Sequence, residues 1–123
     1  MSKKAMLVAA ALLALLALSC VHQTSMHPQG GFITVENRDN DSWRHVRTVE
    51  IFLADGTLFL RQDVLLVYRQ AVSYGVPDGE YFVRVFASMG TGSRATATSE
   101  SFELIGNSGA HLRFRGRALE VTR

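Results

Sequence analysis

Residues 49–61 read Val-Glu-Ile-Phe-Leu-Ala-Asp-Gly-Thr-Leu-Phe-Leu-Arg, and the pattern of this stretch predicts a β-hairpin. Two apolar runs flank Asp55-Gly56, a dipeptide that favours a two-residue type I′ turn, in which both central residues need a positive φ. The turn sets the register of the two strands. The expected opposite pairs are Leu53 with Leu58, Ile51 with Leu60, Phe52 with Phe59, and Glu50 with Arg61. Aromatic and ion pairs of this kind stabilise neighbouring strands.

The rest of the chain from Phe32 onward repeats the same pattern of short strands and turns. Further strands are expected at 32–36, 71–76, 80–87, 94–104, 110–115 and 118–122. Pro77-Asp78-Gly79 is expected to form a three-residue hairpin loop that places Gly75 opposite Tyr81 and leaves room for its ring. The apolar run Val64–Tyr68 fits either a strand or a short buried helical turn.

No segment after residue 20 has the period of an amphipathic helix. Short strands with a turn every 8–12 residues or so indicate a β-sandwich or a small barrel. We therefore expect residues 32–123 to form one all-β domain, a small Greek-key β-sandwich of about seven strands.

The first 19 residues have the composition of an export signal. Lys3 and Lys4 precede an apolar run of 14 residues from Ala5 to Leu18, and Ser19 comes before Cys20. A basic start, an apolar core and a small residue at the cleavage point define a secretory signal peptide. The apolar run is shorter than the roughly 20 residues of a membrane-spanning helix. Residues 1–19 are therefore expected to form a signal helix that is removed.

Residues 16–20, Leu-Ala-Leu-Ser-Cys, resemble the lipobox of bacterial lipoproteins, with Ala17 where that family most often has Leu. The resemblance implies that the Cys20 thiol is diacylated and that Cys20 becomes the first residue of the mature protein. A covalent lipid on Cys20, such as palmitate, would be the only bound group, and it would anchor the chain in a bilayer. The alternative is an ordinary signal peptide that is followed by a chance cysteine.

Residues 20–31 are expected to form the lipidated cysteine and a flexible tether. The tether contains polar residues, Pro28 and Gly30-Gly31, and shows no apolar period. In the lipoprotein family, an Asp after the cysteine holds many proteins at the inner membrane. Val21 stands here instead, and the resemblance therefore favours the outer membrane, with the domain facing the periplasm or the outside.

Residues 76–85, Val-Pro-Asp-Gly-Glu-Tyr-Phe-Val-Arg-Val, resemble the P-x-G-x-Y-x-V-x-V strand of prealbumin-like domains. That group includes the transthyretin-like and carboxypeptidase-regulatory-like modules. The resemblance covers about ten residues. It implies a seven-stranded Greek-key sandwich that serves a structural or binding role and performs no catalysis.

Charge and cysteine content exclude two kinds of chemistry. Lys3 and Lys4 are the only lysines, so the part after the signal has 11 Arg against 11 acidic residues. The basic character of the whole chain therefore comes from the signal and does not indicate a nucleic-acid partner. Cys20 is the sole cysteine, and once lipidated it forms no disulfide.

The remaining motifs do not indicate catalysis. Gly106-Asn107-Ser108-Gly109 resembles the G-D-S-G motif of trypsin-like serine proteases, but 92 residues cannot build the two barrels of such enzymes. We expect no catalytic residue, and the alternative is a small envelope hydrolase. Asp39-Asn40-Asp41 lacks the later ligands of a calcium loop and is interpreted as an Asx-rich turn. The four histidines do not form a zinc pattern, and no metal is expected: His22, His27, His45 and His111.

Two surfaces are candidates for binding. Arg113, Arg115 and Arg117 share one strand parity and are a candidate anion site, because Arg binds phosphate in a bidentate manner. The alternative is a solvated face on which these arginines pair with acids such as Glu103 or Glu120.

Phe52, Phe59, Phe82 and Phe86 have the parity opposite to the expected core face and are a candidate partner surface. The alternative is that these strands are buried on both sides. We therefore expect a membrane-anchored lipoprotein with a non-catalytic binding or structural domain, whose partners are the bilayer and an envelope protein.

Overall fold

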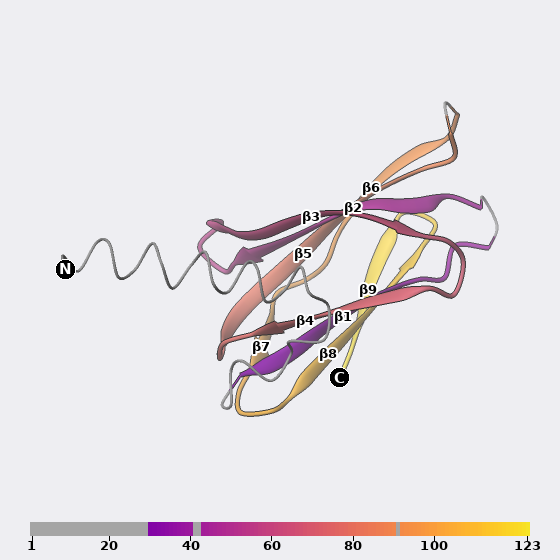
Figure 1. The fold of residues 1–123 in the computed structure, drawn as a ribbon. Helices are drawn as coiled ribbons and strands as arrows, with labels where there is room; N and C mark the ends of the chain where they lie inside the picture. Colours follow the sequence, from indigo (N-terminus) through magenta and orange to yellow (C-terminus); the bar gives the residue numbers. More distant parts are fainter. Residues whose placement is uncertain (1–29, 41–42, 91) are drawn as a thin grey trace, which may run out of the picture.

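The computed structural model describes residues 30–40, 43–90 and 92–123, and it shows two β-sheets packed face to face (Figure 1). One sheet has the strand order β4-β1-β8-β9 and the other has the order β3-β2-β5-β6, with β7 also paired to β5. The strands are β1 (Gly31–Asn37), β2 (His45–Leu53), β3 (Leu58–Leu66), β4 (Ala71–Val76), β5 (Gly79–Ser88), β6 (Arg94–Thr98), β7 (Phe102–Leu104), β8 (Gly109–Arg115) and β9 (Ala118–Thr122). The predicted all-β sandwich is confirmed, with nine strands instead of about seven.

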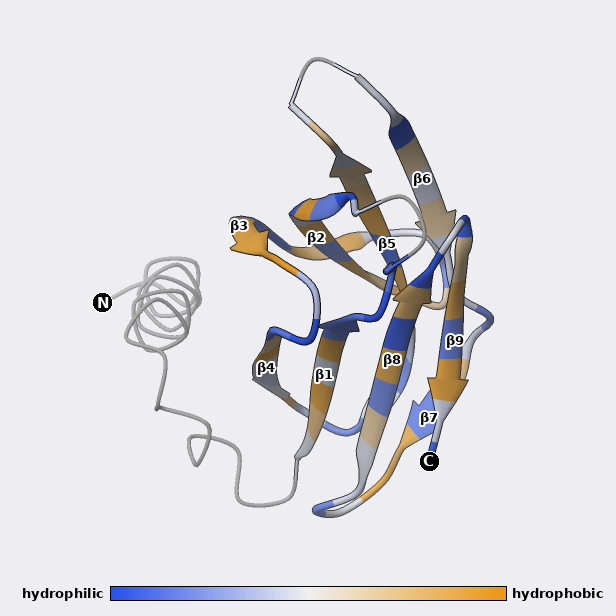
Figure 2. Cartoon of the chain, turned by 90° about the vertical axis from the view of Figure 1, so that its right-hand side faces the viewer, coloured by the Kyte–Doolittle hydropathy of each residue, from blue (hydrophilic) through white to orange (hydrophobic). Residues whose placement is uncertain are grey.

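Alternation along the strands creates the core between the sheets. In β8, apolar residues point inward and polar residues point outward, which Figure 2 shows as alternating orange and blue bands, and β1 has the same alternation of buried and half-buried positions. Ile33, Leu112 and Phe114 are fully buried between the sheets, as are Val83 and Val85 from the opposite side. The part of the chain that the structure describes contains no helix with the length and hydropathy of a membrane span. The predicted signal helix, Cys20 and the tether up to residue 29 lie outside the described residues.

The chain passes repeatedly from one sheet to the other. After the β2–β3 hairpin in the five-stranded sheet, β4 crosses over and pairs with β1, and β5 returns to pair with β2. The return of a fourth strand to the first is the Greek-key connection. β1 and β8 run parallel, with Ile33 opposite Ala110, and this pairing brings the two ends of the domain together.

The turn at Asp55-Gly56 is a three-residue loop, and the predicted two-residue type I′ turn is wrong. The Gly56 N–H donates to the Leu53 carbonyl at 2.9 Å, and within this turn only Gly56 has a positive φ, of 94°. Asp55 keeps a negative φ, and its side chain accepts a 2.8 Å hydrogen bond from the Thr57 N–H. This is the loop in which a type I turn is closed by a left-handed glycine.

A bulge compensates for the longer loop. Glu50 lies opposite Arg61 and Ile51 opposite Leu60, as predicted, but the register shifts before Phe52, which lies opposite Leu58. The expected pairs Phe52–Phe59 and Leu53–Leu58 are therefore wrong. The extra residue of the bulge is Phe59, which a two-residue loop would have paired.

The predicted hairpin at Pro77-Asp78-Gly79 is also wrong, because β4 and β5 belong to different sheets. The segment is a crossing, and the buried side chain of Tyr81 secures it by donating to the Pro77 carbonyl at 2.6 Å. This contact resembles the tyrosine corner of Greek-key sandwiches. Gly75 lies opposite Phe32 in the other sheet, and Gly79 leaves room for the Tyr81 ring, since a Cβ on Gly79 would lie 3.3 Å from the Tyr81 hydroxyl oxygen.

The structure also decides one segment that the sequence left open and divides one strand that was expected to be continuous. Residues 64–66 continue β3, which answers the open question of strand or helix at Val64–Tyr68. The single strand expected at 94–104 is two strands, β6 and β7, which pair with successive parts of β5. Between them, the Ser99 N–H donates to the Val83 carbonyl, and the Ser99 hydroxyl accepts from the Val83 N–H.

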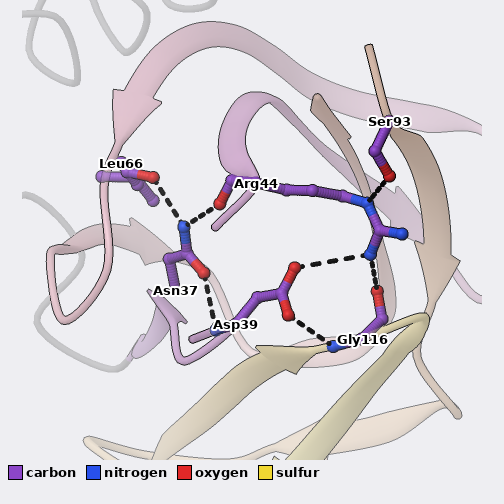
Figure 3. Close-up of polar contacts among 6 residues, drawn as sticks. All are labelled: Asn37, Asp39, Arg44, Leu66, Ser93 and Gly116. Atoms are coloured by element: carbon purple, nitrogen blue, oxygen red, sulfur yellow. Dashed lines mark hydrogen bonds and ion pairs between the residues drawn. The ribbon is translucent and has the colours of Figure 1, made fainter. Parts of the chain in front are cut away.

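A buried polar group, which we call the loop anchor, joins the loops at one end of the sandwich; it consists of Asn37, Asp39 and Arg44 (Figure 3). The Asn37 amide donates to the carbonyls of Arg44 at 2.7 Å and Leu66 at 2.8 Å. Its oxygen accepts from the Asp39 N–H at 2.9 Å. Every hydrogen-bonding atom of this fully buried amide therefore has a partner, as burial of a polar group requires.

Arg44 extends the loop anchor to two more loops. Its guanidinium donates to the Ser93 hydroxyl at 2.7 Å and to the Gly116 carbonyl at 2.9 Å, and it pairs with the Asp39 carboxylate at 3.4 Å (Figure 3). Arg44, together with Asp39 from the segment interpreted as an Asx-rich turn, thus holds the β1–β2 connection against the β5–β6 loop and the β8–β9 turn.

Candidate functional site

The outer face of the five-stranded sheet carries a row of aromatic side chains around one arginine. We call it the aromatic face; it consists of Leu58, Phe52, Phe82, Arg84 and Phe86. Pairing in register places Leu58, Phe52 and Phe82 side by side across β3, β2 and β5. Alternation along β5 then brings Arg84 and Phe86 to the same side, because Val83 and Val85 between them are buried in the core.

The rings of the aromatic face are packed against one another and against the guanidinium of Arg84. Phe52 and Phe82 stack with their centres 4.9 Å apart and their planes within 9°. Arg84 lies 5.0 Å from the centre of the Phe52 ring and 5.3 Å from that of Phe86. Contacts of this kind are worth roughly 0.5–1.5 kcal/mol each. The three rings are half-buried, and Leu58 is 47% exposed.

Glu50 fixes the arginine at the centre of this face. Its carboxylate accepts from Arg84 Nε at 2.8 Å and lies 3.6 Å from the Arg61 guanidinium. The side chains around it leave Glu50 only 5% exposed. The predicted Glu50–Arg61 contact is therefore present, and Arg84 joins it, so that one carboxylate orients two arginines of this sheet.

Phe59 does not belong to the aromatic face, and its predicted position beside Phe52 is wrong. The bulge near the start of β3 removes Phe59 from the pairing and turns its ring toward the core. There it meets the buried ring of Tyr81 edge-on, with the centres 5.9 Å apart. Phe52, Phe82 and Phe86, by contrast, lie on the outer side, as their parity predicts.

A hollow of about 450 Å³ lies on the same face, at the end where β5 turns into β6. Ala87 and Ala95, whose side chains are buried in the core, alternate with the outward residues of these strands. Besides these two alanines, the hollow is lined by Arg47, Phe86, Ser88, Gly90, Arg94 and Thr96. Phe86 thus belongs to both the aromatic face and the hollow, and the two form one continuous surface.

The predicted anion site at Arg113, Arg115 and Arg117 is not assembled as expected. Arg113 and Arg115 are exposed on the outer side of β8, but Arg117 lies in the β8–β9 turn beside Gly116, which has a φ of 65°. Arg113 is 4.0 Å from Glu36 and lies opposite Glu120. The expectation that Arg113, Arg115 and Arg117 share one strand face is therefore wrong, because β8 ends at Arg115. The placement of Arg113 agrees with the alternative of a solvated face with acidic neighbours.

Glu36, on the outer side of the four-stranded sheet, has three basic side chains within 4.0 Å: Arg38, His111 and Arg113. It lies 2.8 Å from His111 Nε2 and 3.3 Å from Arg38. Partial burial raises the pKa of Glu36, but the hydrogen bond from His111 and the charges of Arg38 and His111 together outweigh burial. The pKa of this carboxyl therefore lies below its ordinary value.

The side chains considered for catalysis lie apart. Ser108 accepts a 3.0 Å hydrogen bond from the Ile105 N–H, in a loop where Asn107 has a φ of 30°. His111 pairs with Glu36 on the other side of the sandwich from His45, which lies opposite Ser88. Within residues 30–40, 43–90 and 92–123, no three His, Cys, Asp or Glu side chains gather as metal ligands. His22, His27 and Asp41 lie outside the described residues.

An exposed aromatic group lies beside the loop anchor. Trp43 is 59% exposed, and its ring meets Tyr68 edge-on at 5.8 Å. The guanidinium groups of Arg38 and Arg69 each lie 5.7 Å from the centre of the Tyr68 ring. Trp43 and Arg69 have φ values of 54° and 75°, a strained conformation for such residues. The group adjoins residues 41–42, outside the described residues, and we assign no role to it.

Sequence reasoning missed Arg84, Arg47 and Arg94. The parity that singled out Phe82 and Phe86 also places Arg84 between them, so that signal was present in the sequence. Arg47 has no such signal, because its direction depends on a bulge that only strand pairing reveals. Comparison with family models, with curated proteins and with solved structures finds no match to this chain.

Proposed function

We propose that this chain is a lipid-anchored protein of the cell envelope whose β-sandwich binds a partner protein through the aromatic face and performs no catalysis. The observation that carries the proposal is the stack of Phe52 and Phe82 with Arg84 on the outer side of a sheet. The anchor is proposed to be the acylated thiol of Cys20, on the basis of the signal and lipobox in residues 1–20.

Composition and rigidity support a docking role for this face. Aromatic residues and arginine are enriched in protein interfaces and supply much of their binding energy. The Glu50 carboxylate already orients Arg84, and the stacked rings already restrict one another. A surface that is ordered before binding loses less side-chain entropy when a partner covers it.

The anchor is tested by Cys20→Ala, because the thiol is the proposed acyl acceptor. Cells that grow with radiolabelled palmitate should label the unchanged protein and leave the variant unlabelled, and the variant should keep residues 1–19. A Ser101→Ala variant is the matched control, since Ser101 is exposed and distant in sequence from the signal. Palmitate on the Cys20→Ala variant would contradict the proposal.

Docking is tested with a photo-crosslinking amino acid in place of Leu58, which is exposed on the aromatic face. Irradiation of cells should give one discrete adduct of the full-length protein with a second protein. The same substitution at Ile105, which is 64% exposed in the β7–β8 loop, is the matched control and should not give that adduct.

The adduct supports the docking proposal only if its formation requires the side chains of the aromatic face. Adding Phe82→Ser should abolish it while the protein stays folded by circular dichroism, because one stacked ring on an outer face is worth about 1–2 kcal/mol. An adduct from Leu58 that persists in the Phe82→Ser variant, or the absence of any adduct from Leu58, would contradict the docking proposal.

A further inference from the structure

We propose that the hollow at the β5–β6 end of the aromatic face is a carboxylate-binding subsite, in which Arg47 and Arg94 hold an acidic side chain of the partner protein. The inference rests on the proposed function, which it deepens by stating the chemistry of the partner. That partner would carry an acidic residue beside apolar residues, so that its apolar part covers the rings and its carboxylate enters the hollow.

The first argument is the direction of Arg47. The register of β2 against β5 steps from Val46 opposite Ala87 to Thr48 opposite Phe86, so that Arg47 is the extra residue of a bulge in β2. Bulges turn a side chain away from the regular alternation and are common next to functional sites. Here the bulge brings Arg47 from β2 into a hollow whose other walls come from β5 and β6.

The second argument is an unsatisfied donor. The Nε of Arg47 is buried and has no hydrogen-bond partner among the described residues. A buried donor without an acceptor costs about 1–3 kcal/mol, and more when the group is charged. Because this atom is closed off from the surface, the groups of Arg47 that a carboxylate in the hollow would meet are the outer nitrogens of the guanidinium.

The third argument is charge. None of the ion pairs within the described part of the chain involves Arg47 or Arg94. By contrast, Arg61 and Arg84 on the same face share Glu50. The hollow therefore presents two guanidinium groups whose charge no acid of these residues neutralises, and a guanidinium matches the planar fork of a carboxylate.

The walls of the hollow fit a side chain that is partly apolar. Phe86 offers a ring to its methylene groups, and the hydroxyls of Ser88 and Thr96 can donate to a carboxylate oxygen. The hollow adjoins the β5–β6 hairpin, which extends beyond the other strands in Figures 1 and 2. A partner that lies along the aromatic face toward this hairpin would reach the hollow without a change in the sandwich.

The subsite is tested by titrating benzoate into the full-length protein labelled with ¹⁵N-arginine and following the Nε–Hε signals by NMR. Benzoate joins a carboxylate to an apolar ring, and benzamide is its neutral control. The signals of Arg47 and Arg94 should move in a saturable way with benzoate, with a dissociation constant on the order of millimolar, because few contacts are available. Benzamide should leave these signals in place.

Variants then separate the subsite from general charge effects. Arg47→Gln and Arg94→Gln should each weaken benzoate binding by about tenfold, the usual effect of losing one charged hydrogen bond. Arg115→Gln removes an exposed arginine from the other sheet and should leave binding unchanged. Arg94 lies on an edge strand, so its variant keeps the test available if Arg47→Gln fails to fold.

The outcomes distinguish this inference from the docking proposal. Unsaturable or equal shifts with benzoate and benzamide would overturn the subsite, as would tighter binding of inorganic phosphate to the same two arginines. If the adduct from Leu58 forms and depends on Phe82 but is unchanged in the Arg47→Gln and Arg94→Gln variants, docking stands and the subsite fails. If benzoate binds as expected but no adduct forms from Leu58, the proposed function fails.

Discussion

Asn37→Ala is the substitution that most directly tests the loop anchor. The amide of Asn37 is fully buried, donates to two backbone carbonyls and accepts from one N–H. Each of these hydrogen bonds contributes roughly 0.5–1.5 kcal/mol, and truncation leaves buried backbone groups without their partner. Truncation to alanine should therefore lower the free energy of unfolding by about 3 kcal/mol.

The loss can be measured by urea denaturation followed by circular dichroism, with thermal unfolding as a second measurement. For a domain of this size, a loss of about 3 kcal/mol should lower the melting temperature by roughly 10–20 °C. Asn40→Ala is the matched control, because Asn40 is exposed and the same atoms are removed. Its effect should stay within about 0.5 kcal/mol. Equal stabilities of the two variants would refute the assignment of the loop anchor as a stabilising element.

Two further predictions concern single hydroxyl and carboxyl groups. Tyr81→Phe should destabilise the fold by about 1 kcal/mol, because it removes the hydrogen bond to the Pro77 carbonyl. Tyr74→Phe should be neutral or stabilising, because the buried Tyr74 hydroxyl has no hydrogen-bond partner among the described residues. Equal thermal stabilities of these two variants would contradict the different roles of the two rings. The pKa of Glu36 lies below its ordinary value of 4.5, so its contribution to stability should be complete above that pH and disappear as the pH falls through the lower value. Urea denaturation between neutral and acidic pH should show a weaker decline for Glu36→Gln, and identical declines would refute this role.

The loop anchor at one end of the sandwich and the aromatic face on the five-stranded sheet differ in their burial. The loop anchor holds three connections together with buried hydrogen bonds at one end. The aromatic face, by contrast, has an exposed Leu58 and three half-buried rings on the outer side of its sheet. This arrangement suits a domain that presents a fixed surface and undergoes no change of fold when it is covered.

Local patterns in the sequence were sufficient to predict the strands and the class of fold. Alternation along residues 32–36 and 110–115 identifies inward and outward side chains because successive residues of a strand point to opposite faces. The same parity correctly placed Phe52, Phe82 and Phe86 on the outer side. The predicted hairpin register placed Glu50 opposite Arg61, a pair that is confirmed although the turn type was wrong. These features depend only on the residues of one strand or of the strand that follows it in the chain, and local sequence is therefore enough to predict them.

Tertiary structure alone decided which strands share a sheet and where the alternation is interrupted. Pro77 and Asp78 suit a hairpin as well as a crossing, and the choice depends on the packing of Tyr81 and on the partners that β1 and β2 offer to β4 and β5. The bulge that turns Phe59 inward and the bulge that turns Arg47 into the hollow arise from the fit between neighbouring strands. The position of a bulge depends on how two paired strands match along their length, and the alternation within one strand does not predict it.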